Sequence, residues 1–381
     1  MSISRRSLFR GVAAGAVAGA AISGLPRPSY ANQGLGPIHL DQNENAYGPS
    51  EKTIAAMRDA ATVANRYPQK EADVLTNTIA RTHGVAPEQV VLGCGSTEVL
   101  RMAADAFLDS SQNLVMASPN WGLIADFARN RQAEVVAVPL NKEFAHDLAA
   151  MSTHVDSSAG LVYICNPHNP TGSLTARTDL ELFLKRLPSR TRVVIDEAYH
   201  HYALSSIYTS FIDRPVDDDR LLVTRTFSGI CGLAGLRVGY GITAPRTARL
   251  LSAVRLPSSL NLFAARGAVA ALGDAEYVKA CAERNASQRQ EFLNQANARM
   301  LRAIDSQTNF VMLNTGCSAA SVVEHYRKND ILLPPPFSPM EKYVRVSLGK
   351  PDEMLAFWRV WDQSPFSKMS MPQSKTGLVQ P

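Results

Sequence analysis

Two clusters of small, hydroxyl-bearing and basic residues in this sequence could bind an anion such as a phosphate. The first, residues 93–98 (Gly-Cys-Gly-Ser-Thr-Glu), runs into a predicted helix, and its glycines would let a ligand approach the free N–H groups at the start of that helix. The second, residues 226–239, carries Thr226, Ser228 and Arg237, whose hydroxyl and guanidinium groups suit a phosphate. Taken alone, the glycine-rich cluster fits an ordinary strand-to-helix turn equally well.

Two further clusters could hold a polar ring. Residues 166–172 read Asn-Pro-His-Asn-Pro-Thr-Gly, and two Asn-Pro steps before a Gly favour an extended, turning backbone. Asp196 directly follows the apolar run 193–195, and Tyr199 comes three residues later, so a carboxylate and a phenol would meet at one edge of a sheet. The structural alternatives are a surface loop for the first cluster and a helix N-cap by Asp196 for the second.

The elements that must position these clusters follow from the hydrophobic pattern. Short apolar runs alternate with helical patterns between residues 52 and 245, as in α/β proteins. Several runs lack polar alternation, which is typical of buried strands in a mainly parallel sheet. All four clusters fall at carboxyl ends of predicted strands, where open α/β sheets place their ligands. The predicted strands are Val90–Leu92, Leu114–Ala117, Glu134–Val138, Leu161–Ile164, Arg192–Ile195, Leu221–Val223 and Val238–Ile242.

The length of 381 residues is too great for one compact core, so more than one globular part is expected. We predict a large domain over residues 51–273, with helices that include Ser96–Leu108 and Asp179–Leu187. A long helix and a smaller α+β domain should occupy residues 274–363. The tail 364–381 is rich in Ser, Pro, Gln and Lys, a composition that predicts disorder.

The first 31 residues resemble an export signal. Arg5 and Arg6 precede the mildly apolar run Gly11–Leu25, and small residues follow at the positions that a signal peptidase reads. The paired arginines resemble the twin-arginine signal of bacteria; an uncleaved anchor or a chance arginine pair is the alternative. The sequence therefore predicts an exported, periplasmic protein that is free of the membrane once residues 1–31 are cleaved, with residues 32–50 forming an N-terminal arm.

Charge and cysteine usage exclude other classes of function. The formal net charge of +5 comes mostly from four arginines in the first 31 residues, and the remainder carries 35 basic and 34 acidic residues. The charge of residues 32–381 therefore gives no reason to expect binding of nucleic acid. The five cysteines are scattered without a Cys-x-x-Cys pair, which indicates neither a disulfide framework nor a metal site.

Together and in this order, the four clusters resemble those of fold-type-I, pyridoxal-phosphate-dependent aminotransferases, particularly enzymes similar to histidinol-phosphate aminotransferase. The resemblance runs from about Leu40 to Gly349, and the Asn-Pro-x-Asn-Pro-Thr-Gly and Asp-Glu-Ala-Tyr strings carry it most specifically. It implies a large cofactor-binding domain, a small C-terminal domain and a homodimer. It also implies pyridoxal 5'-phosphate as cofactor and a small-molecule amino acid or 2-oxo acid as substrate.

The resemblance assigns residues to the ring of the cofactor. Asp196 should pair with the pyridine nitrogen, so that the ring can act as an electron sink. Asn169 and Tyr199 should bond to the phenolic oxygen of the ring. Trp121 should stack on the ring face, where the family usually has Tyr or Phe.

The resemblance also assigns residues to the phosphate and the substrate. Arg345 matches the arginine that binds the α-carboxylate of the substrate, and Asn45 lies in a segment that resembles the substrate side of the family. Tyr67 matches a tyrosine that reaches the phosphate from the neighbouring subunit. The other phosphate ligands should be Gly95, Ser96, Thr97, Ser228 and Arg237.

The sequence departs from the family at its decisive residue, the lysine that directly follows the Ser of the fourth cluster. The spacing to Arg237 is intact, and the position is Gly229. A glycine can neither attach the cofactor covalently nor carry a proton, so the sequence predicts non-covalent binding of the cofactor. His200 and His201 could in principle offer a base, although ordinary loop histidines are the plainer interpretation.

Three interpretations of Gly229 are open at this stage. The chain could be a cofactor- or metabolite-binding relative without turnover. It could be a slow enzyme that uses free pyridoxal or pyridoxamine phosphate. Gly229 could also be a sequence error or an engineered change in a normal aminotransferase.

A second departure concerns the substrate. Histidinol-phosphate aminotransferases carry an arginine shortly before the carboxylate arginine, and the corresponding segment 331–337 has no basic residue. The sequence therefore favours an apolar or aromatic amino acid over histidinol phosphate.

Overall fold

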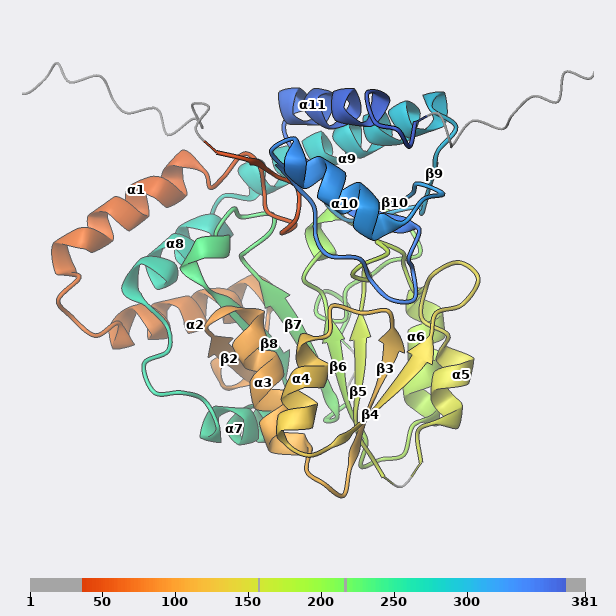
Figure 1. The fold of residues 1–381 in the computed structure, drawn as a ribbon. Helices are drawn as coiled ribbons and strands as arrows, with labels where there is room; N and C mark the ends of the chain where they lie inside the picture. The colour runs from red at the N-terminus through yellow and green to blue at the C-terminus, as the bar shows by residue number, and fades with distance from the viewer. Residues whose placement is uncertain (1–35, 157, 216–217, 368–381) are drawn as a thin grey trace, which may run out of the picture. The chain divides into compact units, whose positions relative to one another are not determined.

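The computed structural model describes residues 36–156, 158–215 and 218–367. Its centre is a seven-stranded sheet in the order β2-β8-β7-β6-β5-β3-β4 (Figure 1). Strand β8 is antiparallel to both of its neighbours, and the other neighbouring pairs are parallel. This confirms the predicted α/β class with a mainly parallel sheet. The strands are β2 (Val90–Gly93), β3 (Asn113–Ser118), β4 (Glu134–Pro139), β5 (Ala159–Cys165), β6 (Arg192–Asp196), β7 (Leu221–Thr226) and β8 (Gly239–Thr243).

Burial on both faces explains why the strands read as continuous apolar runs. In β6, Val193 and Ile195 pack into one hydrophobic core, whereas Val194 between them packs into another. Successive side chains of a strand point to opposite faces, so a strand with a core on each side needs apolar residues at every position. All seven predicted strands are confirmed, with ends that coincide or differ by at most three residues.

The two faces of the sheet are covered by different helices (Figure 1). One core contains residues of α2, α5, α6 and α8, and α1 packs against α8. The other core contains residues of α3, α4 and α7. These helices are α1 (Glu51–Ala60), α2 (Gln69–His83), α3 (Gly95–Phe107), α4 (Leu123–Asn130), α5 (Leu148–Thr153), α6 (Arg177–Arg186), α7 (Pro245–Ala253) and α8 (Leu262–Leu272), with short 3-10 turns η1 (Ala61–Val63), η2 (Pro87–Gln89), η3 (His200–Tyr202) and η4 (Ala234–Leu236).

The C-terminal third builds a smaller sheet with its own core. Its strands lie in the order β12-β10-β9, and neighbouring strands are antiparallel. Strand β1 of the N-terminal arm pairs in parallel with β11, so hydrogen bonds connect the arm to this part. Aromatic side chains such as Phe292, Phe357 and Trp361 fill its core. The elements are β1 (Ile38–His39), α9 (Ala275–Ala298), β9 (Arg302–Ala303), β10 (Phe310–Asn314), α10 (Ala319–Lys328), β11 (Ile331–Leu332), β12 (Tyr343–Ser347) and α11 (Pro351–Asp362).

Several predictions concern the chain ends. The export signal 1–31 and the tail from residue 368 onward lie outside the described residues. The expected start of the large domain coincides with the start of α1 at Glu51, and the expected start of the second part falls one residue before α9. Within the described ranges, none of the helices combines the length and the apolar character needed to cross a bilayer.

Candidate active site

The four sequence clusters meet at one edge of the central sheet. Strands β2, β5, β6 and β7 run in the same direction, so the segments that follow them emerge together. Because β8 runs the opposite way, it begins at this edge, and Arg237 precedes it by two residues. The edge holds a cavity of about 420 Å³. Of the predicted site residues, the cavity wall includes Ser96, Thr97, Trp121, Asn169, Asp196, Tyr199, Ser228, Gly229, Arg237 and Arg345.

Asp196 is a buried carboxylate without a cation beside it. Its Oδ1 accepts from the hydroxyl of Thr224 at 3.0 Å and from the backbone N–H of Ala198 at 3.2 Å, and its Oδ2 accepts from the hydroxyl of Tyr163 at 2.8 Å. It forms no ion pair with any residue that the structure describes. Burial raises its pKa above 3.8, because desolvation disfavours the charged form. A ligand N–H with positive character would relieve this cost.

The hydroxyl of Tyr199 is arranged to donate its proton into the cavity. Its oxygen accepts from the amide groups of Asn43 at 3.0 Å and Asn169 at 3.1 Å. Both lone pairs of the oxygen are therefore used, and the O–H remains free for a ligand oxygen. Burial raises the pKa of Tyr199 above its ordinary value of 10, which keeps the phenol protonated.

A cation without a carboxylate partner stands at the start of α3. The Nη1 of Arg237 donates to the carbonyl of Ala234 at 3.1 Å and lies 3.3 Å from the hydroxyl of Ser228, and Nη2 lies 3.4 Å from the hydroxyl of Thr97. No acidic group pairs with it in the described part of the chain. The φ of Gly95 is +74°, and a Cβ there would collide with the guanidinium. Glycine at this position thus lets Arg237 lie against the helix start, as an anion site requires.

A second arginine closes the other end of the cavity. The Nη1 of Arg345 donates to Oδ1 of Asn169 at 2.8 Å, and Nη2 donates to the carbonyl of Asp41 at 2.6 Å. Its buried Nε has no hydrogen-bond partner in the described residues, and the guanidinium lies 5.2 Å from the ring centre of Phe337. Burial lowers the pKa of Arg345 from 12.5. A carboxylate would supply the missing acceptor and the missing charge.

Gly229 lines this cavity, and none of the cavity-lining residues is a lysine. A Cβ built on Gly229 would meet only Tyr202, at 3.5 Å from its hydroxyl oxygen. His200 and His201 line a different cavity, so the structure does not bring them to this site as bases.

Three predicted residues are not part of the cavity wall, namely Gly95, Tyr67 and Asn45. Trp121 lines the cavity but is 46% exposed. Tyr67 is 86% exposed and does not line it. Asn45 does not line it either, and its amide donates to the carbonyl of Ile230 at 3.0 Å. Asn43, two residues earlier, is part of the cavity wall.

The sequence analysis did not single out Tyr163 and Thr224, which bond to Asp196. Asn43, which bonds to Tyr199, lies in the segment 43–45 that resembles the substrate side of the family. Tyr163 carries a hydroxyl in the otherwise apolar β5, and Thr224 is the first of three polar residues that end β7. Buried polar groups are rarely without a hydrogen-bond partner. Polar residues in buried strands were therefore the sequence signal that could have revealed these two site residues. The position of Asn43 was not readable, because its contact with Tyr199 joins residues 156 apart in the sequence.

Comparisons with known proteins agree with this geometry. The sequence pattern described as Aminotransferase class I and II matches residues 36–357. A histidinol-phosphate aminotransferase of Methylobacillus flagellatus is 37% identical over 328 residues, which cover 86% of this chain and 88% of that protein. One of Geobacillus thermodenitrificans is 36% identical over 299 residues, covering 78% and 81%. The crystal structure of histidinol-phosphate aminotransferase from Sinorhizobium meliloti in complex with pyridoxal-5'-phosphate is similar with a TM-score of 0.81 at 25% identity, covering 92% of this chain and 99% of that one.

Proposed function

We propose, from the premise that this chain belongs to the class I and II aminotransferases, that it binds pyridoxal phosphate in the cavity described above without a covalent bond to the protein. The family consists of transferases that use this cofactor, and a similar structure was solved in complex with it. The observation that carries the proposal is Gly229, which lines the cavity in the absence of any lysine in the cavity wall.

The residues present fit pyridoxal phosphate at three points. The carboxylate of Asp196, buried without a cation, suits a protonated pyridine nitrogen. The free O–H of Tyr199 suits the phenolic oxygen of the ring. The phosphate suits Arg237, which lies beside the start of α3 because Gly95 has no side chain.

When bound, the cofactor would supply an electron sink for the bonds at the Cα of an amino acid. Asp196 would hold a proton at the ring nitrogen of the cofactor. Burial raises the pKa of this carboxyl, and the positive charge of a protonated ring would offset the cost of ionising it. Tyr199 would hold a proton toward the phenolic oxygen. Arg345 would orient the substrate by its α-carboxylate, after exchanging its bond to Asn169. Residue 229 has no side chain that can carry a proton. We therefore expect turnover to be slower than in a family member with the lysine, by roughly the 10²–10⁴-fold that positioned acid–base groups contribute.

The second candidate function is binding of pyridoxal phosphate or another metabolite without turnover, and Gly229 is again the observation that favours it. Absorbance of the purified protein with added cofactor separates covalent from non-covalent binding, and borohydride followed by mass spectrometry locates any covalent adduct. Under the proposal, the cofactor stays dialysable after borohydride treatment. A cofactor–lysine peptide would contradict the proposal. Release of a 2-oxo acid from an amino acid then separates slow turnover from binding alone.

For the substrate, we propose an apolar or aromatic amino acid and its 2-oxo acid. The similar proteins named above are histidinol-phosphate aminotransferases, but the segment 331–337 offers no basic residue. Arg237 and Arg345 are the only cationic side chains in the cavity wall, and Phe337 packs beside Arg345. Thermal shifts of the cofactor-loaded protein with L-phenylalanine, L-leucine and histidinol phosphate test this choice. A shift with histidinol phosphate alone would contradict it.

We also propose a homodimer in which Tyr67 of each subunit reaches the phosphate of the other. The support is the 86% exposure of this aromatic side chain outside its own cavity, together with the dimers typical of the family. Sedimentation of the cofactor-loaded protein tests the oligomeric state.

For location, we propose export to the periplasm through the twin-arginine route, on the strength of Arg5, Arg6 and the apolar run that follows. A reporter fused after residue 31 should be exported, and replacement of both arginines by lysine should retain it in the cytoplasm.

A further inference from the structure

A second cavity of about 630 Å³ lies beside β7 and shares one lining residue, Thr226, with the cofactor cavity. Its buried cation is Arg225, which stands between Thr224 and Thr226 in β7. Thr224 bonds to Asp196, and alternate side chains of a strand point to opposite faces. Arg225 therefore leaves β7 on the side away from Asp196.

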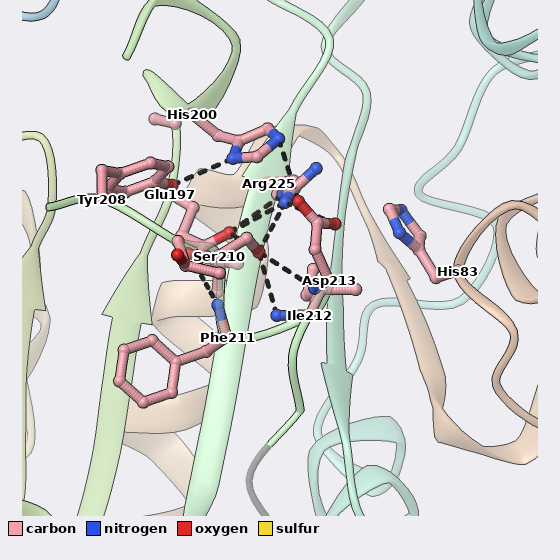
Figure 2. A network of polar contacts seen from close by, with 12 residues as sticks. His83, Glu197, His200, Tyr208, Ser210, Phe211, Ile212, Asp213 and Arg225 are labelled. Carbon is pink, nitrogen blue, oxygen red and sulfur yellow. Dashed lines mark hydrogen bonds and ion pairs between the residues drawn. The ribbon is translucent and has the colours of Figure 1, made fainter. Parts of the chain in front are cut away.

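The guanidinium of Arg225 is held on one side only (Figure 2). Its Nε donates to Oε2 of Glu197 at 3.1 Å and its Nη2 donates to the hydroxyl of Ser210 at 2.7 Å. Nη1 makes no hydrogen bond to any residue in the described ranges. Since Arg225 lines the cavity, a ligand there can reach a fixed cationic donor.

Asp213 lies beside the same guanidinium, at Nη2, but it is loosely attached. Its Oδ1 lies 3.5 Å from Nη2 of Arg225, and its Oδ2 lies 3.6 Å from Nε2 of His200. The side chain is 48% exposed, so it can turn to water at little cost. Once Asp213 turns to water, an external carboxylate can take its place beside the guanidinium.

The histidines around the polar end are uncharged at neutral pH. Burial, with Arg225 second, lowers the pKa of His83 to about 4 and that of His201 to about 3, and it also lowers the pKa of His200. Figure 2 shows His83 beside the network without a contact to it. These rings offer hydrogen bonds rather than charge, so Arg225 remains the anion-binding group in the buried wall.

Another part of the cavity wall is mostly apolar. It includes Leu272 from the end of α8 and Val278 and Ala282 from α9, together with Phe227 and Cys231. Lys279 of α9 also lines the cavity, but its side chain is 78% exposed. A ligand that fills the cavity would therefore carry an anionic end and an aliphatic body.

We propose that this cavity binds a small aliphatic carboxylate, with its carboxylate on Arg225 in the place of Asp213 and its aliphatic chain against Val278 and Ala282. A branched-chain fatty acid and a branched-chain 2-oxo acid share this chemistry. The site is separate from the proposed cofactor cavity and does not depend on cofactor binding.

Calorimetric titration with 4-methylpentanoate tests the proposal, since this acid has neither an amine nor a ketone to react. The uncharged 4-methylpentanamide is the control ligand. Titration with 4-methyl-2-oxopentanoate shows whether the cavity prefers the 2-oxo acid or the fatty acid. We expect Asp213→Asn to tighten binding about threefold or more, because it removes the internal competitor. We expect Val278→Phe to weaken binding about tenfold or more, because it fills the apolar end. Asp126→Asn and Val74→Phe, at exposed positions outside the cavity, should leave binding unchanged.

Arg225→Ala is unsuitable as the main variant, because it would leave the buried carboxylate of Glu197 without its partner. Arg345→Gln removes the carboxylate-binding group of the cofactor cavity, where 4-methylpentanoate can also bind, and the binding of this acid at the second cavity should persist in that variant. Equal binding of the amide, unchanged affinity in both Asp213→Asn and Val278→Phe, or loss of binding in Arg345→Gln would each overturn the proposal.

Discussion

The hydroxyl oxygen of Tyr202 lies 3.5 Å from the point where a Cβ would stand on Gly229. This is ordinary van der Waals contact, and the φ of Gly229 is not in the left-handed region. No backbone atom of a non-neighbouring residue lies within 4 Å of that point. The fold therefore does not require a glycine at this position.

Gly229→Lys should create a covalent attachment point for pyridoxal phosphate, because Asp196, Tyr199 and Arg237 already surround the cavity. We expect borohydride to fix the cofactor to Lys at position 229 in this variant and to fix nothing in the wild type. Peptide mapping by mass spectrometry measures the adduct. Gly235→Lys is the matched control, since Gly235 lines the same cavity with open space at its Cβ but lies outside the frame of the family's lysine.

An adduct of equal yield in both lysine variants would mean that covalent attachment of the cofactor does not depend on position 229. The absence of an adduct in Gly229→Lys at saturating cofactor would mean that Ile230 and Cys231, both buried next to it, have repacked the space for the lysine chain.

Asp196→Asn should weaken the binding of pyridoxal phosphate about tenfold or more, because a charge-assisted hydrogen bond contributes roughly 1.5–3 kcal/mol. Equilibrium dialysis measures the affinity. Oδ1 would keep the donors Thr224 and Ala198, and the hydroxyl of Tyr163 can turn to accept from the new amide. An unchanged affinity would show that the ring nitrogen does not lie at Asp196.

The same substitution should stabilise the cofactor-free protein at neutral pH. Burial raises the pKa of Asp196 above 3.8, so its ionisation destabilises the folded chain at every pH above the folded pKa. Below pH 3.8 the carboxyl is protonated in both the folded and unfolded chain, and the advantage of Asn should vanish. Denaturant unfolding of both proteins across this pH range measures the difference, and a constant difference at all pH values would assign the effect to packing.

Arg345→Gln should weaken the binding of substrate carboxylates about tenfold or more, whereas the affinity for pyridoxal phosphate should change little. Arg345 bonds to Asn169 and Asp41 but does not contact the residues expected at the phosphate. Titration of 3-phenylpropionate and of the cofactor into both proteins separates the two affinities. Equal losses for both ligands would indicate collapse of the cavity.

Hybrid dimers test the placement of Tyr67. Tyr67→Ala and Arg237→Ala homodimers should each bind pyridoxal phosphate weakly. If Tyr67 acts across the interface, a mixed dimer regains one intact site, formed by Arg237 of one subunit and Tyr67 of the other. Cofactor binding after mixing and refolding measures the recovery. No recovery in a dimer shown to be mixed would place Tyr67 on its own subunit or outside the site.

The sequence by itself determined the α/β class, the seven strands and most of the cavity wall. Strands such as β6 have an unbroken apolar interior, here residues 193–195. The polar clusters follow directly after these runs, so local pattern and spacing carried this information. The absence of a lysine at residue 229 was also readable, since its spacing from Arg237 is fixed by a short segment.

Only the tertiary structure decided how the N-terminal arm completes the cofactor cavity and which residues gather around Arg225. Asn43 and Asn45 are equivalent in the sequence, but Asn43 donates to Tyr199 and Asn45 to the carbonyl of Ile230. The cavity at Arg225 likewise joins residues of α2, η3, β7 and α9. Such contacts depend on how distant segments pack, and packing is set by the sum of many weak interactions that no local pattern records.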